Sequence, residues 1–135
     1  MTTKKMPYQV LTDSDVSKVL TMKVAVQKIE DALREKSQGT LIAPPRFSID
    51  IKNGSLVFTA GAATKKEKVI GFRAYSSFER REAGTNYIQL VAVFDSESGD
   101  FKGVVIGSLI GALRTGAIGG VAVKYTLTKR NGRKC

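Results

Sequence analysis

The residue best suited to bind a ligand is Arg114, which lies in a run of small and apolar residues from Gly107 to Lys124. Gly107 and Ser108 are typical of a helix start, because serine can accept a backbone N–H of the first turn and glycine permits an abrupt entry from a strand. A guanidinium in apolar surroundings needs a partner, and its planar fork suits a carboxylate or a phosphate. The run therefore predicts a helix that carries an anion-binding arginine beside Thr115.

Two interpretations of Arg114 are open at this point. Its charge is either paired with an acidic side chain of the same chain or available to a ligand. The chain contains no histidine, and its single cysteine is Cys135. These counts exclude Ser-His and Cys-His nucleophiles, a cysteine-based metal site and an internal disulfide. Because no charge lies between Arg114 and Lys124, the helix is also expected to be covered on most of its sides.

The composition is that of a soluble globular domain with an excess of positive charge. The 135 residues suffice for one compact core, with 42% hydrophobic and 25% charged residues. A net charge of +10 attracts polyanions, but the basic residues cluster at 4–5, 65–68 and 129–134, as in solvated loops and ends. No apolar run approaches a signal peptide or a membrane span. We therefore expect a cytoplasmic protein with neither nucleic-acid nor membrane partners.

Two helices and a hairpin are predicted in the first half of the chain. Capping residues and a 3.6-residue rhythm predict helices over 12–20 and 22–36, with Gly39 as the stop of the second. Apolar and polar residues alternate from Phe47 to Phe58, and Asn53-Gly54 supplies a two-residue turn. These residues therefore predict a β-hairpin.

Further strands and the small-residue helix are predicted in the second half. The small residues at 59–63 indicate a flexible connection, and the strand at 69–75 places Arg73 on the face opposite Phe72. The nearly continuous apolar run at 87–94 predicts a central strand covered on both faces, and 101–106 pairs back on it. The predicted fold class is α+β, with a mainly antiparallel or mixed sheet packed with helices and the small-residue helix at the C-terminal end.

Five motifs, in the right order, resemble the ornithine cyclodeaminase and mu-crystallin family. They are Leu11–Val16, Pro44–Phe47, Gly71–Tyr75, Phe94–Gly99 and Ala112–Ala117. The resemblance covers nearly the whole chain. It implies a first domain that binds substrate and makes the dimer contact, followed in relatives by a second domain that binds NAD or NADP.

The resemblance assigns substrate-binding roles to Arg46, Arg73 and Arg114. Arg46 matches a family arginine that grips the substrate carboxylate, and Arg114 matches one that contacts this carboxylate near the cofactor phosphates. Arg73 stands where the family usually has a lysine that hydrogen-bonds substrate and helps to move protons. An arginine titrates too high to be a practical general base, so this departure argues against ornithine cyclisation itself.

The resemblance also implies cofactor contacts. Arg114 and Thr115 are expected beside the cofactor, and Thr85 or Asn86 supplies a polar contact where the family has a Leu-Pro-Thr segment. Residues 59–61 stand where many relatives have Met-Pro-Ala in the pocket lining. No catalytic residue and no metal ligand is expected in this chain, because the acidic residue credited with catalysis in the family belongs to the second domain.

The expected organisation is a substrate-binding and dimerisation domain over residues 1–125 and an interdomain linker or truncated end over 126–135. The chain has no G-x-G-x-x-G motif after a strand, so it is not expected to hold the dinucleotide tightly or to turn over alone. We expect a homodimer that binds a small amino or cyclic imino acid, as part of a cyclodeaminase, amino-acid dehydrogenase or imine reductase. The alternative is a non-catalytic module of the mu-crystallin type that binds a small carboxylate or only dimerises.

Overall fold

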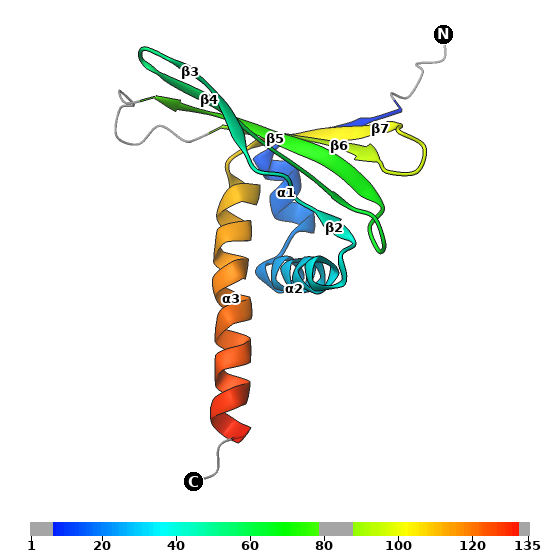
Figure 1. The fold of residues 1–135 in the computed structure, drawn as a ribbon, viewed down its shortest axis with the longest axis vertical. Helices are drawn as coiled ribbons and strands as arrows, with labels where there is room; N and C mark the ends of the chain where they lie inside the picture. The colour runs from blue at the N-terminus through cyan, green and yellow to red at the C-terminus, as the bar shows by residue number, and fades with distance from the viewer. Residues whose placement is uncertain (1–6, 79–87, 133–135) are drawn as a thin grey trace.

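The computed structural model describes residues 7–78 and 88–132. These residues form one sheet and three helices, as the α+β prediction requires (Figure 1). In chain order the elements are β1 (Gln9–Leu11), α1 (Asp13–Val19), α2 (Met22–Gln38), β2 (Leu41–Ile42), β3 (Phe47–Ile51), β4 (Gly54–Ala63), β5 (Val69–Phe78), β6 (Gln89–Asp95), β7 (Phe101–Gly107) and α3 (Leu109–Gly132). Helix α3 thus continues past residue 125 without a break in its secondary structure.

The sheet follows the order β1-β7-β6-β5-β4-β2, and β3 also pairs with β4. Only the pairing of β1 with β7 is parallel, so the sheet of the described residues is mixed but mainly antiparallel. The predicted hairpin is confirmed, with Phe47 opposite Phe58 and Ile51 opposite Gly54. The two longest strands, β4 and β5, therefore lie side by side in the sheet.

The small residues at 59–63 are strand rather than a flexible connection. All ten residues of β4 pair with β5, from Gly54 opposite Phe78 to Ala63 opposite Val69. Small side chains suit this segment because a Cβ at Gly61 would lie 2.9 Å from the carbonyl oxygen of Ile42 on β2. The close approach of β2 therefore explains a composition that otherwise resembles a loop.

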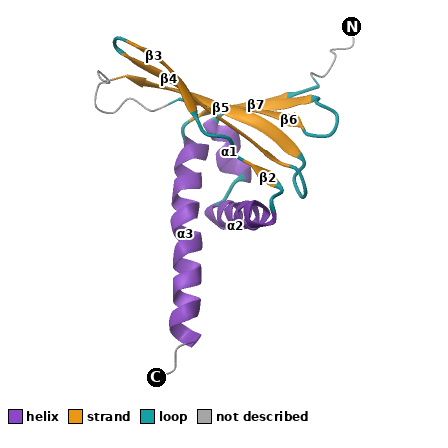
Figure 2. Ribbon diagram, in the orientation of Figure 1, coloured by secondary structure: helices purple, strands orange, loops and turns teal. Residues whose placement is uncertain are grey.

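All three helices lie on one side of the sheet, which we call the inner side (Figures 1 and 2). Helix α1 begins with a capping box between Thr12 and Asp15. Helix α2 ends at Gly39 as predicted, with φ of 78° in the left-handed region that glycine adopts without strain. Helix α3 leaves the end of β7 and runs away from the sheet past α2.

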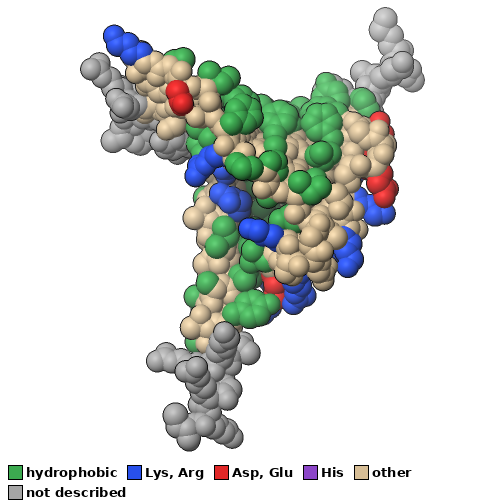
Figure 3. Space-filling model, viewed as in Figure 1, with side chains coloured by type: hydrophobic (Ala, Val, Ile, Leu, Met, Phe, Trp, Pro, Cys, Tyr) green, Lys and Arg blue, Asp and Glu red, His purple; other side chains and the backbone are tan. Residues whose placement is uncertain are grey.

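The other side of the sheet, the outer side, carries a row of apolar side chains that no helix covers. Exposed fractions range from 37% at Phe72 and Leu90 to 61% at Phe47. Strand β6 is therefore central but not covered on both faces by this chain, contrary to the prediction. The exposed residues that share this side by strand register are Val10, Ile42, Phe47, Ile49, Ile51, Leu56, Ile70, Phe72, Phe78, Leu90 and Ile106. Figure 3 shows hydrophobic side chains gathered over the strands.

The glycines of α3 let this helix approach its neighbours closely. A Cβ at Gly120 would lie 2.9 Å from Val26 Cγ2, and a Cβ at Gly116 would lie 2.9 Å from Met22 Cε, both on α2. Burial is confined to one side of α3, where Ala117 is fully buried. The prediction of cover on most sides is wrong for this chain, since Val123 on the helix is 57% exposed.

Candidate functional site

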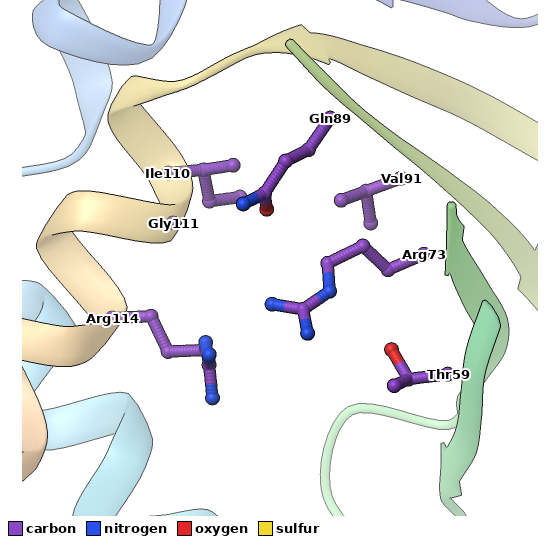
Figure 4. A pocket seen from close by; sticks show the side chains of 7 residues that line it. All are labelled: Thr59, Arg73, Gln89, Val91, Ile110, Gly111 and Arg114. Carbon is purple, nitrogen blue, oxygen red and sulfur yellow. The ribbon is translucent and has the colours of Figure 1, made fainter. Parts of the chain in front are cut away.

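A cavity of about 360 Å³ lies where the first turns of α3 meet the inner side of β4, β5 and β6 (Figure 4). Arg73 and Arg114 point toward one another across it from β5 and α3. Its lining is completed by Thr59, Gln89, Val91, Ile110 and Gly111. Two predicted binding residues, far apart in sequence, therefore share one concave site.

Arg73 is a partly buried cation of this site. Its Nε atom is buried and has no hydrogen-bond partner among the described residues. Its guanidinium carbon lies 5.0 Å from the ring centre of Tyr75, two residues along the same face of β5. Burial, and next the nearby charge of Arg114, lower the pKa of Arg73, and Arg46 adds to this effect. The folded chain thus holds a cation in surroundings that disfavour its charge.

Arg114 lies on the second turn of α3 and is exposed on the cavity side. Within residues 7–78 and 88–132, no carboxylate forms an ion pair with Arg114 or Arg73. Pairing within the chain, one of the two interpretations of Arg114, therefore finds no support in the described residues. An anion from outside them fits the site.

Arg46 is near the cavity but does not line it. Its Nη1 donates a hydrogen bond to the Tyr75 hydroxyl oxygen over 3.3 Å, just before β3 begins. Tyr75 is therefore contacted by Arg46 through its hydroxyl and by Arg73 through its ring. The structure brings Arg73 and Arg114 together at the cavity and places Arg46 on its margin.

Of the described residues predicted to contact the cofactor, only Arg114 lines the cavity. The Thr115 hydroxyl donates to the carbonyl oxygen of Gly111 over 3.0 Å, a bond within the helix that is common for threonine. Thr115 follows Arg114 but does not line the cavity. Thr85 and Asn86 lie outside the described residues.

Gln89 is a site residue that the sequence analysis missed. It begins β6, opposite Tyr75, and its side chain points into the cavity between α3 and Arg73 (Figure 4). Its Oε1 atom is buried without a hydrogen-bond partner in the described part of the chain. One signal was available, since Gln89 is the single amide in the apolar run 88–94. Its contact with α3 depended on sheet register and was not readable from sequence.

Asp13 fixes the start of α3 beside the cavity. Its carboxylate accepts the backbone N–H of Leu109 over 2.9 Å and that of Ser108 over 3.0 Å. These bonds, Leu109 first, lower the pKa of Asp13. Ser108 was predicted to cap the helix with its hydroxyl, but this hydroxyl itself donates to Asp13 over 3.4 Å. Gly107 has φ of 153°, and a Cβ there would collide with the Asp13 carboxylate.

Glu30 on α2 fixes a later part of α3. This buried carboxylate accepts hydrogen bonds from Lys124 Nζ over 2.8 Å and from the Tyr125 hydroxyl over 2.9 Å. Arg34 pairs with it over 3.0 Å from one turn further along α2. Bonds from Lys124 and then Tyr125 lower the pKa of Glu30. We call these four residues the Glu30 cluster.

Residues 7–78 and 88–132 lack two further features, a membrane-spanning helix and a cluster of metal ligands. No helix in these ranges combines the length and apolar character needed to cross a membrane. The same ranges contain no group of three or more His, Cys, Asp or Glu side chains arranged to hold a metal ion.

Three solved structures of similar fold contain a bound nicotinamide dinucleotide. The chain aligns with an archaeal alanine dehydrogenase dimer with bound NAD at a TM-score of 0.77 and 25% identity, covering 87% of this chain and 37% of that one. It aligns with the Δ1-pyrroline-2-carboxylate reductase of Thermococcus litoralis, in complex with NADH and L-proline, at a TM-score of 0.78 and 26% identity, covering 86% and 37%.

A third similar structure is the iminosuccinate reductase of Paracoccus denitrificans in complex with NAD⁺, with a TM-score of 0.78, 23% identity and coverage of 87% and 38%. The chain therefore spans 37–38% of the length of these proteins. No curated protein sequence matches the chain significantly. The model of the ornithine cyclodeaminase/mu-crystallin family matches residues 6–134. The chain belongs to the ornithine cyclodeaminase/mu-crystallin family.

Proposed function

We propose that this chain forms the carboxylate-binding side of the substrate site in a nicotinamide-dependent enzyme that acts on a small amino or cyclic imino acid. One observation carries the proposal: Arg73 and Arg114 line one cavity, and neither is paired with a described carboxylate. A ligand carboxylate would give the buried Nε of Arg73 the acceptor that it lacks. It would also offset the repulsion between the two guanidinium groups.

The relatives support the nicotinamide part of the proposal. The archaeal alanine dehydrogenase, the Thermococcus reductase and the Paracoccus reductase were all solved with NAD, NADH or NAD⁺. When bound, such a cofactor supplies the hydride chemistry. The residues of this chain do not fit a dinucleotide on their own, because no G-x-G-x-x-G motif follows a strand. Its residues would hold and orient the acid while the cofactor is bound by another domain.

The reaction proposed for the whole enzyme is cyclodeamination, amino-acid dehydrogenation or imine reduction. Arg73 favours the last two. A guanidinium stays protonated near neutral pH even where burial lowers its pKa, so Arg73 suits binding rather than proton transfer. The cavity walls next to it are apolar at Val91 and Ile110, which suits the hydrocarbon part of a small amino or imino acid.

Carboxylate binding is tested by titrating the chain with pyrrole-2-carboxylate and L-proline while backbone amide NMR signals are followed. We expect saturable chemical-shift changes at residues of the cavity. In Arg114→Gln the affinity for the acid should fall about tenfold or more, because a charge-assisted hydrogen bond is lost. Lys23→Gln, which removes the same charge from exposed α2 surface, serves as control. Equal binding by the two variants would show that net charge alone attracts the acid and would refute the site.

The enzyme part of the proposal is tested by the reading frame beyond Cys135. A downstream strand followed by a glycine-rich phosphate loop would permit assays of NADH oxidation with cyclic imines and of NAD⁺ reduction with amino acids. If translation stops at Cys135, the dehydrogenase reaction is ruled out for this protein. Carboxylate binding with dimerisation, as in a mu-crystallin-type module, would then be the function to measure.

The outer side of the sheet supports the proposal of a homodimer. Eleven large apolar side chains of this side are more than a third exposed in the described chain, and an extended apolar face of this kind marks an interaction surface. The archaeal alanine dehydrogenase of the same fold is a dimer. A second copy of the chain, which carries the same apolar face, is therefore the proposed occupant.

Sedimentation of the chain tests this assembly. We expect a dimer for the wild type and a monomer for Phe72→Glu or Leu90→Glu, which put a charge in the centre of the apolar face. Val123→Glu on the exposed side of α3 provides the control, because it also replaces an exposed apolar residue. A dimer that persists in both sheet variants but is lost in Val123→Glu would place the interface on α3 instead.

A further inference from the structure

Two residues that line the cavity, Arg73 and Gln89, each have a buried polar atom without a hydrogen-bond partner among the described residues. Arg73 Nε is a donor and Gln89 Oε1 is an acceptor. A buried polar atom without a partner costs free energy, so such atoms in a cavity point to a ligand that completes their bonds. A ligand that satisfies both atoms must present an acceptor to Arg73 Nε and, next to it, a donor to Gln89 Oε1.

Sheet register sets the two side chains side by side. Arg73 lies opposite Val91 and Tyr75 lies opposite Gln89, so Gln89 is the diagonal neighbour of Arg73 on the same face. Diagonal neighbours on adjacent strands are separated by about 7–8 Å at the backbone, within reach of two long side chains. Figure 4 shows the carboxamide oxygen of Gln89 on the side of Arg73. One small ligand can thus contact both groups.

The orientation of the Gln89 carboxamide follows from its neighbours. A flipped amide would turn its NH₂ group toward the Arg73 guanidinium, where two donors would face each other. The whole carboxamide packs against α3, since a Cβ at Gly111 would lie 2.9 Å from Oε1 and 3.1 Å from Nε2 of Gln89. Gly111 leaves room for the carboxamide, and the positive charge of Arg73 favours the orientation in which the oxygen rather than the NH₂ group is nearer to it.

We infer that Gln89 is a specificity-determining residue that accepts a hydrogen bond from a ligand N–H adjacent to the carboxylate. The inference rests on the proposed carboxylate site and narrows its ligands to acids whose α-nitrogen carries hydrogen, such as amino acids and protonated cyclic imines. Arg73 binds the carboxylate, and Gln89 rejects acids that present an acceptor in place of the N–H. A 2-oxo acid presents an acceptor at this position and is expected to bind more weakly than the amino acid or imine of the same carbon skeleton.

A matched pair of planar ligands tests this role. Pyrrole-2-carboxylate and furan-2-carboxylate have nearly the same shape, but the first presents an N–H donor where the second presents an oxygen acceptor. We expect the chain to bind the pyrrole at least about tenfold more tightly, because the furan leaves the buried acceptor unpaired. Binding is measured as dissociation constants from backbone amide NMR titrations.

Three variants test whether Gln89 is responsible for the difference in affinity between the pyrrole and the furan. In Gln89→Met, which keeps an unbranched side chain, the ratio of the two dissociation constants should fall to within about twofold of one. In Gln89→Glu an acceptor remains, so the ratio should persist although both carboxylates bind more weakly beside the new negative charge. Gln38→Met, on α2 outside the cavity, is the control and should leave the ratio unchanged.

The variant Gly111→Ala tests whether ligand discrimination can be lost without loss of thermal stability. Its methyl group meets only the end of a flexible side chain, so the helix should keep or gain thermal stability while the displaced carboxamide loses discrimination. Equal binding of pyrrole and furan by the wild type, or a ratio unchanged in Gln89→Met, would overturn the inference and leave the carboxylate site standing. Failure of both ligands to bind would overturn the carboxylate site itself, and the inference with it.

Discussion

Two of the cations on helix α3, Arg114 and Lys124, are in opposite situations. Lys124 reaches a buried carboxylate in the Glu30 cluster, where Tyr125 and Arg34 bind the same group. Arg114, nearer the start of the helix, faces Arg73 across a cavity without any described carboxylate. The first arrangement is complete within the chain and holds two helices together. The second is incomplete, and the missing member is an anion. The ion pair of Lys124 within the chain stabilises the fold, whereas Arg114, which has no carboxylate partner in the described chain, is available to bind a ligand.

The strongest way to break this contrast is to supply the missing carboxylate. Thr59 lies opposite Arg73 on β4 and lines the cavity, so Thr59→Glu should form a cross-strand ion pair there. We expect the affinity for pyrrole-2-carboxylate to fall at least about thirtyfold while the thermal unfolding midpoint rises. Thr59→Gln, without the charge, is the matched control. Unimpaired binding in Thr59→Glu would show that the acid does not use Arg73.

The converse change removes the carboxylate of the Glu30 cluster. Glu30→Gln removes the negative charge of a buried side chain that accepts a hydrogen bond from Lys124 and pairs with Arg34, so the thermal midpoint should fall by roughly 5 °C or more. Affinity for pyrrole-2-carboxylate should stay within about twofold, since the cluster lies away from the cavity lining. Calorimetry and the NMR titration measure the two effects. An equally large loss of affinity would mean that the two parts of α3 are coupled.

A smaller effect is expected from replacing the buried cation itself. Arg73→Met keeps the long side chain but removes a charge whose surroundings disfavour it, as the lowered pKa of Arg73 indicates. The free energy of unfolding should rise by about 1 kcal/mol, because an unpartnered buried donor is removed, while ligand binding is lost. Chemical denaturation checks the first part. A destabilised Arg73→Met variant would mean that the guanidinium supports the fold, through its contact with Tyr75 for example.

The smallest expected effect concerns pH. The pKa values of Asp13 and Glu30 are lowered from 3.8 and 4.5 respectively. Their contribution to stability is therefore complete above these values and is lost as pH falls through them toward the lower folded pKa values. The thermal midpoint should decline below about pH 5, and less steeply in Asp13→Asn. An identical slope in this variant would show that other carboxylates account for the acid sensitivity.

Local chemistry made part of this structure predictable. Asn53-Gly54 specifies its own turn, Gly39 ends α2 through its left-handed conformation, and the isolated cation Arg114 stood out against an apolar helix. These features depend on residues close in sequence. They account for the hairpin, for the end of α2 and for one residue that lines the cavity, whereas the role of Arg73 was expected from the family resemblance.

The remaining features depend on residues distant in sequence. The strand at 59–63 is specified by its pairing with β5 and β2 rather than by its own composition. Gln89 becomes a site residue only through its register with Tyr75 and its contact with Gly111. The apolar run of β6 did indicate burial, but the cover that its outer side needs is not supplied by the described chain.

The connection between Asp13 and α3 has a kinetic consequence. The carboxylate at the start of α1 bonds to an N–H 96 residues later, and β1 pairs with β7 at a similar separation. Contacts of such high sequence separation slow folding, because a long loop must close before they form. During synthesis, α1 and β1 cannot reach their final partners until residue 109 has left the ribosome. The cavity needs side chains from both β5 and α3, so it cannot form during synthesis before the start of α3 has emerged.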